Sequence, residues 1–225
     1  MIHENTVPSE HQVDEHIAQS TLSSRPRILF VGNSITLHGE KAEIGWYGCW
    51  GMAASCREKD YVHQVMQRVH AIVPDAGYMI VQTAGWERGY WNAPEEFDFL
   101  CTAAAYDADI IVVRLGENVQ PKELKAHDLT EGYCRLFEFL DPKHEKKLIV
   151  TDEFWANPSK DACIEEACRR RGVDVTRISH LGLRGDMKAL GLFEHSGVAA
   201  HPGDKGMQCI AEIIFDAMKD MLEKE

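Results

Sequence analysis

The sequence lacks the features that would place it in a membrane or on nucleic acid. It has no apolar run long enough to span a bilayer, and its first residues lack the apolar stretch of a signal peptide. Positive charge is scarce, since 24 Lys and Arg stand against 36 Asp and Glu, a formal net charge of −12. We therefore expect a cytoplasmic protein that binds a small neutral molecule, with no nucleic acid and no membrane as partner.

Cysteine patterns typical of disulfide frameworks and zinc ribbons are also missing. The seven cysteines are odd in number and contain no Cys-x-x-Cys pair, so reduced thiols are expected. A cysteine nucleophile remains an alternative, although buried cysteines commonly act as small apolar residues. No cluster has a recognisable metal-ligand spacing, which predicts no metal and no cofactor.

Internal repeats, low-complexity segments and Gly/Ser linkers are absent from the body of the chain. The 225 residues fit one domain, which we place at residues 26–225 after an N-terminal arm at residues 1–25 without hydrophobic periodicity. The segment from His38 to Ser55 is rich in glycine and aromatic residues. A loop of that length is usually functional or covers a site.

Short apolar runs alternate with amphipathic stretches from Arg27 onward. The runs predict five strands, at residues 28–31, 78–81, 110–113, 148–150 and 173–178. Apolar residues at helical spacing predict helices between them, at residues 61–73, 123–140, 160–170 and 207–221. This order is typical of an α/β fold with a mostly parallel, doubly wound sheet between two helical layers, in which ligands bind beyond the carboxyl ends of the strands.

The first predicted strand runs directly into Gly32-Asn33-Ser34-Ile35-Thr36. A serine at the carboxyl end of a strand, eased by a glycine turn, is in a position typical of a nucleophile. Ser34 or Thr36 could equally cap the following segment, and such turns also bind phosphate. For this turn alone, the capping role is favoured.

Two further blocks favour the role of nucleophile over the capping role for Ser34. Arg114-Leu115-Gly116-Glu117-Asn118 follows the third strand, and Ala200-His201-Pro202-Gly203 precedes the final helix. With the serine block, they resemble the SGNH (GDSL-like) hydrolase family over most of residues 27–218. The resemblance implies a flavodoxin-like SGNH hydrolase fold and an esterase activity.

The chemistry of an esterase explains these residue types. A serine hydroxyl becomes a good nucleophile when an imidazole accepts its proton, and histidine titrates near neutral pH. By resemblance, Ser34 is the nucleophile and His201 its base, with His195 as the nearest rival. Asn118 and the backbone N–H of Ser34 then donate to the oxyanion, unless Asn118 is only a turn residue.

The sequence departs from the family at the orienting acid. The family usually has an aspartate three residues before its histidine, and Val198 stands there. Glu194, Asp204 or a backbone carbonyl could replace it. We therefore expect a dyad of Ser34 and His201 with an unconventional third member.

A second departure follows the second predicted strand, where the family supplies a glycine N–H to the oxyanion hole. The matching position falls nearer Glu87 than Gly85, and either backbone N–H could serve. A carboxylate beside an oxyanion would be unusual. We therefore expect Glu87 to point away, to pair with Arg88 or Arg114 or to bind substrate, with a solvated surface position equally weighted.

Tryptophans in the segments after the first two strands suggest a pocket rim: Trp46, Trp50, Trp86 and Trp91. Aromatic faces suit sugars and acyl chains, although each indole could equally be core. The sequence thus favours hydrolysis of a small carboxylic ester, an acetyl ester above others, on a carbohydrate or another small molecule. The alternatives are an acyltransferase or phosphate-ester enzyme using the same serine, and a carbohydrate-binding protein that has lost activity, which Val198 supports.

Overall fold

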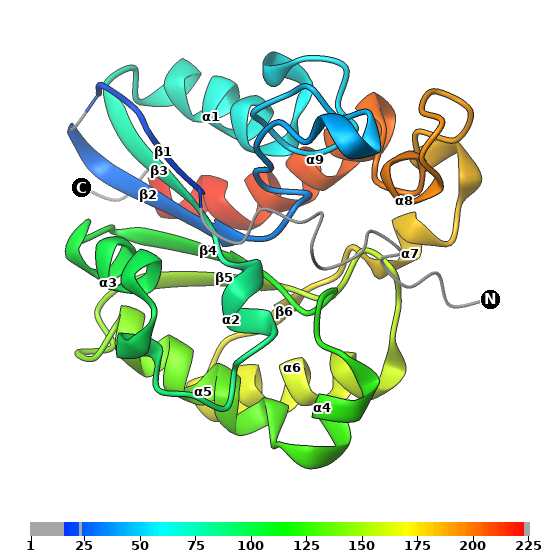
Figure 1. Ribbon diagram of the computed structural model, residues 1–225. Coiled ribbons are helices and arrows are strands. Elements are labelled where there is room, and N and C mark those ends of the chain that lie inside the picture. Colours follow the sequence, from blue (N-terminus) through cyan, green and yellow to red (C-terminus); the bar gives the residue numbers. More distant parts are fainter. Residues whose placement is uncertain (1–15, 23, 223–225) are drawn as a thin grey trace.

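The computed structural model describes residues 16–22 and 24–222. Its centre is a six-stranded sheet with the order β1-β3-β2-β4-β5-β6 (Figure 1). The strands are β1 (His16–Gln19), β2 (Ser24–Gly32), β3 (Ala76–Gln82), β4 (Ile110–Arg114), β5 (Lys147–Thr151) and β6 (Val175–Thr176). All neighbours are parallel except β1, which runs antiparallel to β3.

The edge strand β1 was not predicted, so the sheet has six strands where the sequence indicated five. It lies within the predicted arm, of which residues 1–15 and 23 are outside the described part of the chain. Its four residues show no apolar alternation that would reveal a strand. Pairing with β3, with Ile17 opposite Val81, holds it in the sheet.

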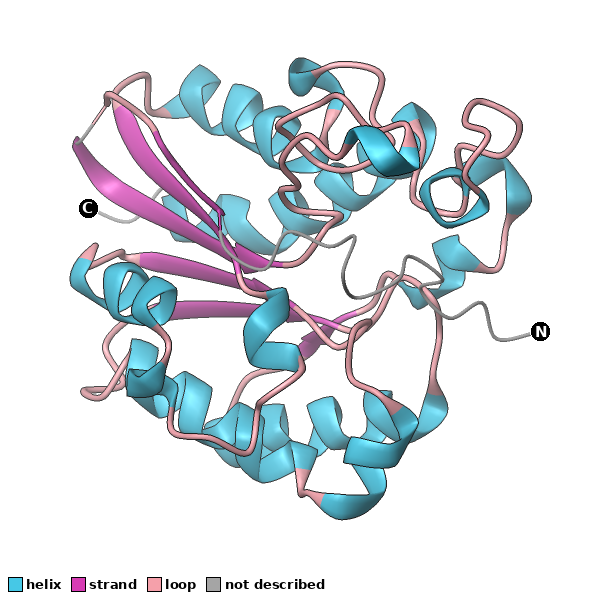
Figure 2. Cartoon of the chain, viewed as in Figure 1, coloured by secondary structure: helices cyan, strands magenta, loops and turns pink. Residues whose placement is uncertain are grey.

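Helices cover both faces of the sheet, as Figure 2 shows. Alternate residues of each inner strand enter opposite cores, since Ile28 and Phe30 pack on one face and Leu29 and Val31 on the other. The first face is covered by α1 (Tyr61–Ile72) and α9 (Asp204–Leu222). The second is covered by α3 (Asp98–Ala105), α5 (Leu129–Leu140) and α6 (Pro158–Arg171). The predicted three-layer α/β fold is confirmed.

Helix ends follow local capping chemistry. Asp60 caps α1 by accepting from the His63 backbone N–H at 2.8 Å. The helix predicted over residues 123–140 is instead two, α4 (Pro121–Ala126) and α5, because Asp128 accepts from the Glu131 N–H and starts a new helix. The remaining helical segments are short: α2 (Ala84–Glu87), α7 (Ser179–Gly182), α8 (Ser196–Ala199), η2 (Ala42–Ile44), η3 (Arg57–Lys59), η4 (Pro94–Glu96) and η5 (Gly185–Met187).

The strand register brings the three sequence blocks to one edge. Gly32 at the end of β2 is level with Gln82 of β3 and with Arg114 of β4. The residues that follow these positions therefore leave the sheet side by side. Within the described residues, no helix is both long and apolar enough to cross a membrane.

Candidate active site

Ser34 stands in a tight turn just beyond β2. The N–H groups of Thr36 and Leu37 both donate to the Asn33 carbonyl, at 2.8 and 3.0 Å, and this closes the turn. A Cβ on Gly32 would collide with the Thr36 side chain, so glycine is required where the chain bends. The turn projects Ser34 from the carboxyl edge of the sheet, and only 6% of its surface is exposed.

His201 lies beside Ser34, although 167 residues separate them. The Oγ of Ser34 is 2.8 Å from Nε2 of His201, and Nδ1 of the same ring is 2.7 Å from the Gly197 carbonyl oxygen. A carbonyl can only accept, so Nδ1 carries the proton and Nε2 is the bare nitrogen. The Ser34 hydroxyl therefore donates to a ring held in the tautomer that a general base needs.

The end of α8 explains why a carbonyl is available to this ring. The last carbonyls of a helix lack partners within it. Here the His201 N–H donates to the Val198 carbonyl at 3.0 Å, which leaves the Gly197 carbonyl to the imidazole. Of the three substitutes considered for the missing aspartate, the structure puts the backbone carbonyl at Nδ1.

The acidic candidates lie elsewhere. Glu194 is exposed, and Asp204 accepts from the backbone and hydroxyl of Ser55, both at 2.8 Å, and from Lys59 at 2.7 Å. The rival His195 caps α8, where its Nδ1 accepts from the Val198 N–H at 3.4 Å. Within the described part of the chain, it is the His201 side chain that is brought to Ser34.

The His201 ring is fully buried. The Trp155 ring meets it edge-on, with centroids 5.0 Å apart and planes at 84°. Burial disfavours the imidazolium and lowers the pKa of His201 to about 3, with His38 and Arg114 adding to the effect against the opposing Gly197 hydrogen bond. The base is therefore neutral, and able to accept a proton, throughout the neutral and mildly acidic range.

This low pKa predicts an unusual pH profile for any activity that uses His201. We expect kcat/KM to stay level from pH 8 to about pH 5, because the acid limb reports the pKa of the free base. Since the folded pKa lies below the unfolded value of about 6.5, His201 also removes stability as pH falls from about 6.5 toward 3. A kinetic profile with circular dichroism at each pH tests this, and an acid limb centred near 6.5 in folded protein would contradict it.

The buried carboxylate of Glu87 accepts hydrogen bonds from four N–H groups near the Ser34 turn. Its Oε1 accepts from the backbone of Gly116 at 2.5 Å and of Asn118 at 3.3 Å, and from the Asn33 amide at 3.0 Å. Its Oε2 accepts from the Asn118 amide at 2.5 Å. The solvated position given equal weight for Glu87 is wrong, because these donors compensate its burial. Glu87 links the serine block to the block after β4.

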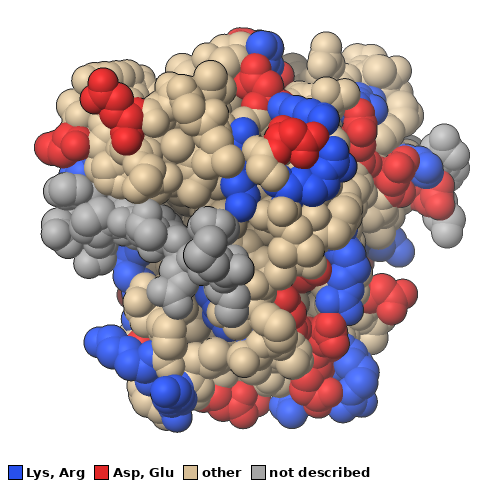
Figure 3. Space-filling model, turned by 90° about the vertical axis from the view of Figure 1, so that its right-hand side faces the viewer, with Lys and Arg blue, Asp and Glu red and all other residues tan. Residues whose placement is uncertain are grey.

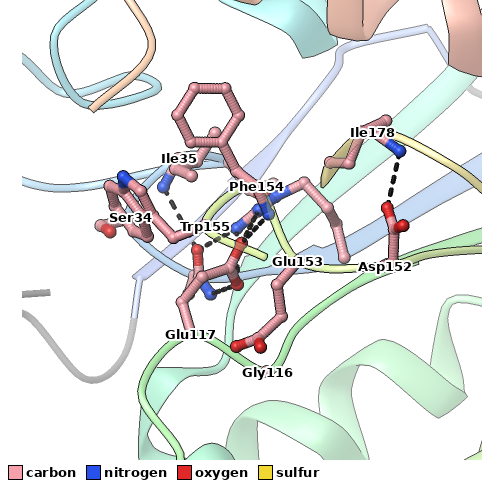
Figure 4. Close-up of polar contacts among 12 residues, drawn as sticks. Ser34, Ile35, Gly116, Glu117, Asp152, Glu153, Phe154, Trp155 and Ile178 are labelled. Carbon is pink, nitrogen blue, oxygen red and sulfur yellow. Dashed lines mark hydrogen bonds and ion pairs between the residues drawn. The ribbon is translucent and has the colours of Figure 1, made fainter. Parts of the chain in front are cut away.

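A second carboxylate, Glu117, forms a buried ion pair with Arg114 at 2.5 Å. Arg114 also donates to the Asn33 amide oxygen, and Glu117 accepts from the Asn33 amide nitrogen at 2.6 Å and from the Phe154 backbone at 3.1 Å. Burial raises the pKa of Glu117, but the guanidinium and the hydrogen bonds outweigh it and lower the pKa overall. Burial and the Glu117 charge raise the pKa of Glu87. Figure 4 shows Glu117 in the same cluster as Ser34 and Phe154.

The loop after β4 is held from the α6 side as well. Lys160 donates to the Gly116 carbonyl at 2.9 Å and pairs with the buried Glu153 at 2.6 Å. Gly116 has φ +132, and a Cβ there would lie 2.8 Å from the Glu153 side chain. Asp152, by contrast, points toward the Ile178 N–H, to which it bonds at 2.6 Å (Figure 4). Lys160 thus holds the Gly116 carbonyl, and Glu87 holds the Gly116 N–H.

No protein-family model matches the sequence, and no curated protein does either. Solved structures do match. A lipase/acylhydrolase from Enterococcus faecalis is 14% identical, with a TM-score of 0.53 over 88% of this chain and 98% of its own. The chain has the SGNH hydrolase fold. The salicylyl-acyltransferase SsfX3 of a tetracycline biosynthetic pathway is 15% identical, with a TM-score of 0.52 over 88% of this chain. This chain spans 56% of the length of SsfX3.

Val198, three residues before His201, takes part in an apolar cluster. It is buried with Ile44, Trp46 and Met52. Its side chain therefore belongs to the packing between α8 and the His38–Ser55 segment, and the imidazole uses the neighbouring carbonyl instead.

Val198→Asp should destabilise the protein without restoring a triad. A carboxylate in this apolar cluster gains no cation as partner, so we expect a loss of about 3 to 5 kcal/mol at pH 8, comparable to an uncompensated buried charge. Urea unfolding of Val198→Asp and the uncharged Val198→Asn separates charge from shape, and the difference between them should shrink at pH 5. An Asp variant with higher kcat and unchanged stability would show that the carboxylate reaches Nδ1.

The expectation that four tryptophans line one pocket is wrong. Trp46 and Trp50 pack together in the Val198 cluster, with ring centroids 5.6 Å apart. Trp86 is fully buried on the other side of the sheet, and Trp91 packs against that same core. Their chain positions follow different strands, and the sheet separates the two pairs. An indole that does lie beside the dyad is that of Trp155, for which no role was predicted.

The long His38–Ser55 segment packs against the site. The Met52 N–H donates to the Ser34 carbonyl at 2.9 Å, and Trp46 contacts Phe193 from the chain that leads to α8. Figure 3 shows the face to which α7 and α8 belong, where neutral side chains cover much of the surface between separate small groups of charges. The segment therefore packs against the Ser34 turn and the chain that leads to α8.

Asn33 and Glu117 had no predicted role, and Arg114 was expected only as a possible partner of Glu87, although all three lie in the blocks after β2 and β4. One signal was available, since Arg114 directly follows a run of four apolar strand residues and is level with buried sheet positions. A charge in such a place needs a partner. Its partner, Glu117, is three residues further along the chain.

Proposed function

We propose that this protein is a serine hydrolase that cleaves a small carboxylic ester through an acyl-enzyme on Ser34, with His201 as base. The observation that carries the proposal is the contact of Ser34 Oγ with the unprotonated Nε2 of His201 at 2.8 Å. The Gly197 carbonyl fixes the ring from its other side. The fold shared with a lipase/acylhydrolase supports the same chemistry.

The reaction runs in two half-steps. In the first, the Ser34 proton passes to His201 Nε2 while Oγ bonds to the ester carbonyl carbon, giving a tetrahedral oxyanion. Collapse breaks the bond to the alcohol oxygen, which takes the proton from His201. Water then repeats the sequence on the acyl-enzyme, releasing the carboxylic acid and restoring Ser34 and His201.

The oxyanion donors in this proposal are the backbone N–H of Ser34, the Asn118 amide and the backbone N–H of Gly85. For the last of these, the geometry of α2 favours Gly85 over Glu87. The Glu87 N–H already donates to the Thr83 carbonyl at 3.4 Å, whereas Gly85 lies in the first turn of the helix, where N–H groups have no helical acceptor.

The burial of the dyad supports a small acyl group. With 6% of Ser34 and none of His201 exposed, a long acyl chain would require the surrounding segments to move. Because Trp46 and Trp86 belong to the core, we extend the proposal to an acetyl-sized acyl group but no longer to a carbohydrate in preference to other alcohols.

The experiment is rapid mixing with nitrophenyl acetate. We expect a burst of nitrophenolate that approaches one equivalent of enzyme, an added acetyl mass on the peptide containing Ser34, and kcat/KM that falls from acetate to butyrate to octanoate. Absence of both burst and acetyl adduct would reject the proposal and favour the binding-protein alternative.

Acyl transfer is the second candidate, and one observation favours it: SsfX3, described as a salicylyl-acyltransferase, shares the fold. Transfer and hydrolysis have the same first half-step and differ in which nucleophile attacks the acyl-enzyme. Adding an alcohol acceptor during steady-state turnover separates them. A hydrolase should release acetate and nitrophenolate in equal amounts, while a transferase should release less acetate and form the acetylated alcohol.

A further inference from the structure

The contacts of the Glu87 carboxylate converge on Asn33, which precedes Ser34, and on the loop after β4. Glu87 is fully buried at the end of α2. One of its oxygens faces three N–H groups, from Gly116, Asn118 and Asn33, and the other faces the Asn118 amide nitrogen. Every one of these four contacts requires Glu87 to accept.

We propose that Glu87 is a positioning residue that orients the Asn118 side-chain amide, so that the amide presents an N–H to the oxyanion formed on Ser34. The inference rests on the proposed function. An Asn amide can rotate to offer either its oxygen or its nitrogen in one direction. The short contact from Asn118 Nδ2 to Glu87 Oε2, 2.5 Å, fixes which way round the amide stands.

The surroundings allow a carboxylate in this position. Arg114 places a buried guanidinium in the same network, through Asn33 and Glu117, and counters the negative charge. Asn33 also ties Glu87 to the turn that carries Ser34, since its amide nitrogen donates to Glu87 at 3.0 Å and to Glu117 at 2.6 Å. Glu87 therefore contacts both the turn that carries Ser34 and the side-chain amide of Asn118.

The test is Glu87→Gln, which keeps the shape and changes one acceptor into a donor. The new amide has one oxygen, and it makes the largest number of hydrogen bonds when it faces the N–H groups of Gly116, Asn118 and Asn33. The new NH₂ group then faces Asn118 Nδ2, and two donors cannot bond, so the Asn118 amide must turn its oxygen toward that group. We expect kcat to fall about 100- to 1,000-fold, as for loss of an oxyanion donor, with KM changed less than about threefold.

A double-mutant cycle separates positioning from a general structural role. In the Asn118→Ala background, Glu87→Gln should lower kcat less than about threefold, because the group through which it acts is gone. An unchanged penalty there would mean that Glu87 acts through Gly116 or Asn33, and would overturn the inference. Faster turnover in Glu87→Gln would overturn it in another way, by showing that the carboxylate blocks the oxyanion site.

Controls make the outcomes distinct. Glu95→Gln, an exposed carboxylate outside this network, should leave kcat unchanged. If Glu87→Gln does not fold by circular dichroism, Glu87→Asp replaces it in the same cycle, since it keeps the charge but withdraws it from Asn118. Full activity of Ser34→Ala would reject the proposed function itself, whereas full activity of Glu87→Gln alongside an inactive Ser34→Ala rejects only the role of Glu87.

Discussion

Ser34→Ala is expected to lower kcat for nitrophenyl acetate hydrolysis by about 10⁴- to 10⁶-fold, because the hydroxyl that forms the acyl-enzyme is gone. His201→Gln should be nearly as damaging. It keeps a polar side chain of similar size against Trp155 but cannot take the Ser34 proton at Nε2. Steady-state kinetics on the purified variants, with urea unfolding to confirm the fold, measures both effects.

The double variant is the more decisive measurement. Because Ser34 and His201 act as one unit through their 2.8 Å contact, the double variant should be no slower than Ser34→Ala alone. Ser159→Ala, which removes an exposed hydroxyl on α6, should retain wild-type activity. Independent, multiplying losses would mean that the two residues do not form a dyad.

Arg114→Met should cause a large loss of stability, about 3 to 5 kcal/mol at pH 8. The guanidinium is fully buried, pairs with Glu117 and bonds to Asn33. Methionine fills similar space but leaves the buried Glu117 and Glu87 carboxylates without their cation. Urea unfolding measures the loss, and Arg170→Met, whose pairs with Glu166 and Glu131 are exposed, should cost less than about 1 kcal/mol.

The pH dependence of this loss gives an internal check. In the wild type, the lowered pKa of Glu117 supplies stability above its unfolded value, and this stability disappears as pH falls through the folded pKa. Without Arg114 the buried carboxyl prefers to be protonated, so the deficit should be smaller at pH 5 than at pH 8. A deficit independent of pH would indicate lost packing in place of lost charge compensation.

The layers of the fold could be predicted from the amino-acid sequence. Residues 28–31 and 110–113 are continuous apolar runs, which suit strands buried on both faces, and the stripe from Met207 to Met218 predicted the last helix. The sequence also selected Ser34 and His201, because strand ends and the turn before a final helix are visible in the order of residue types. The edge strand β1 escaped, since its four residues carry no period and its place depends on pairing with β3.

The surroundings of the dyad could not be predicted in the same way, because they depend on how distant segments pack. No pattern in the sequence could choose among Glu194, Asp204 and a carbonyl for His201 Nδ1, because that choice follows from how α8 ends and leaves the Gly197 oxygen without a helical partner. The role of Glu87 was hidden for a similar reason. Its four donors come from segments 29 to 54 residues away, and only the parallel register of β2, β3 and β4 brings them within hydrogen-bond distance of one carboxylate.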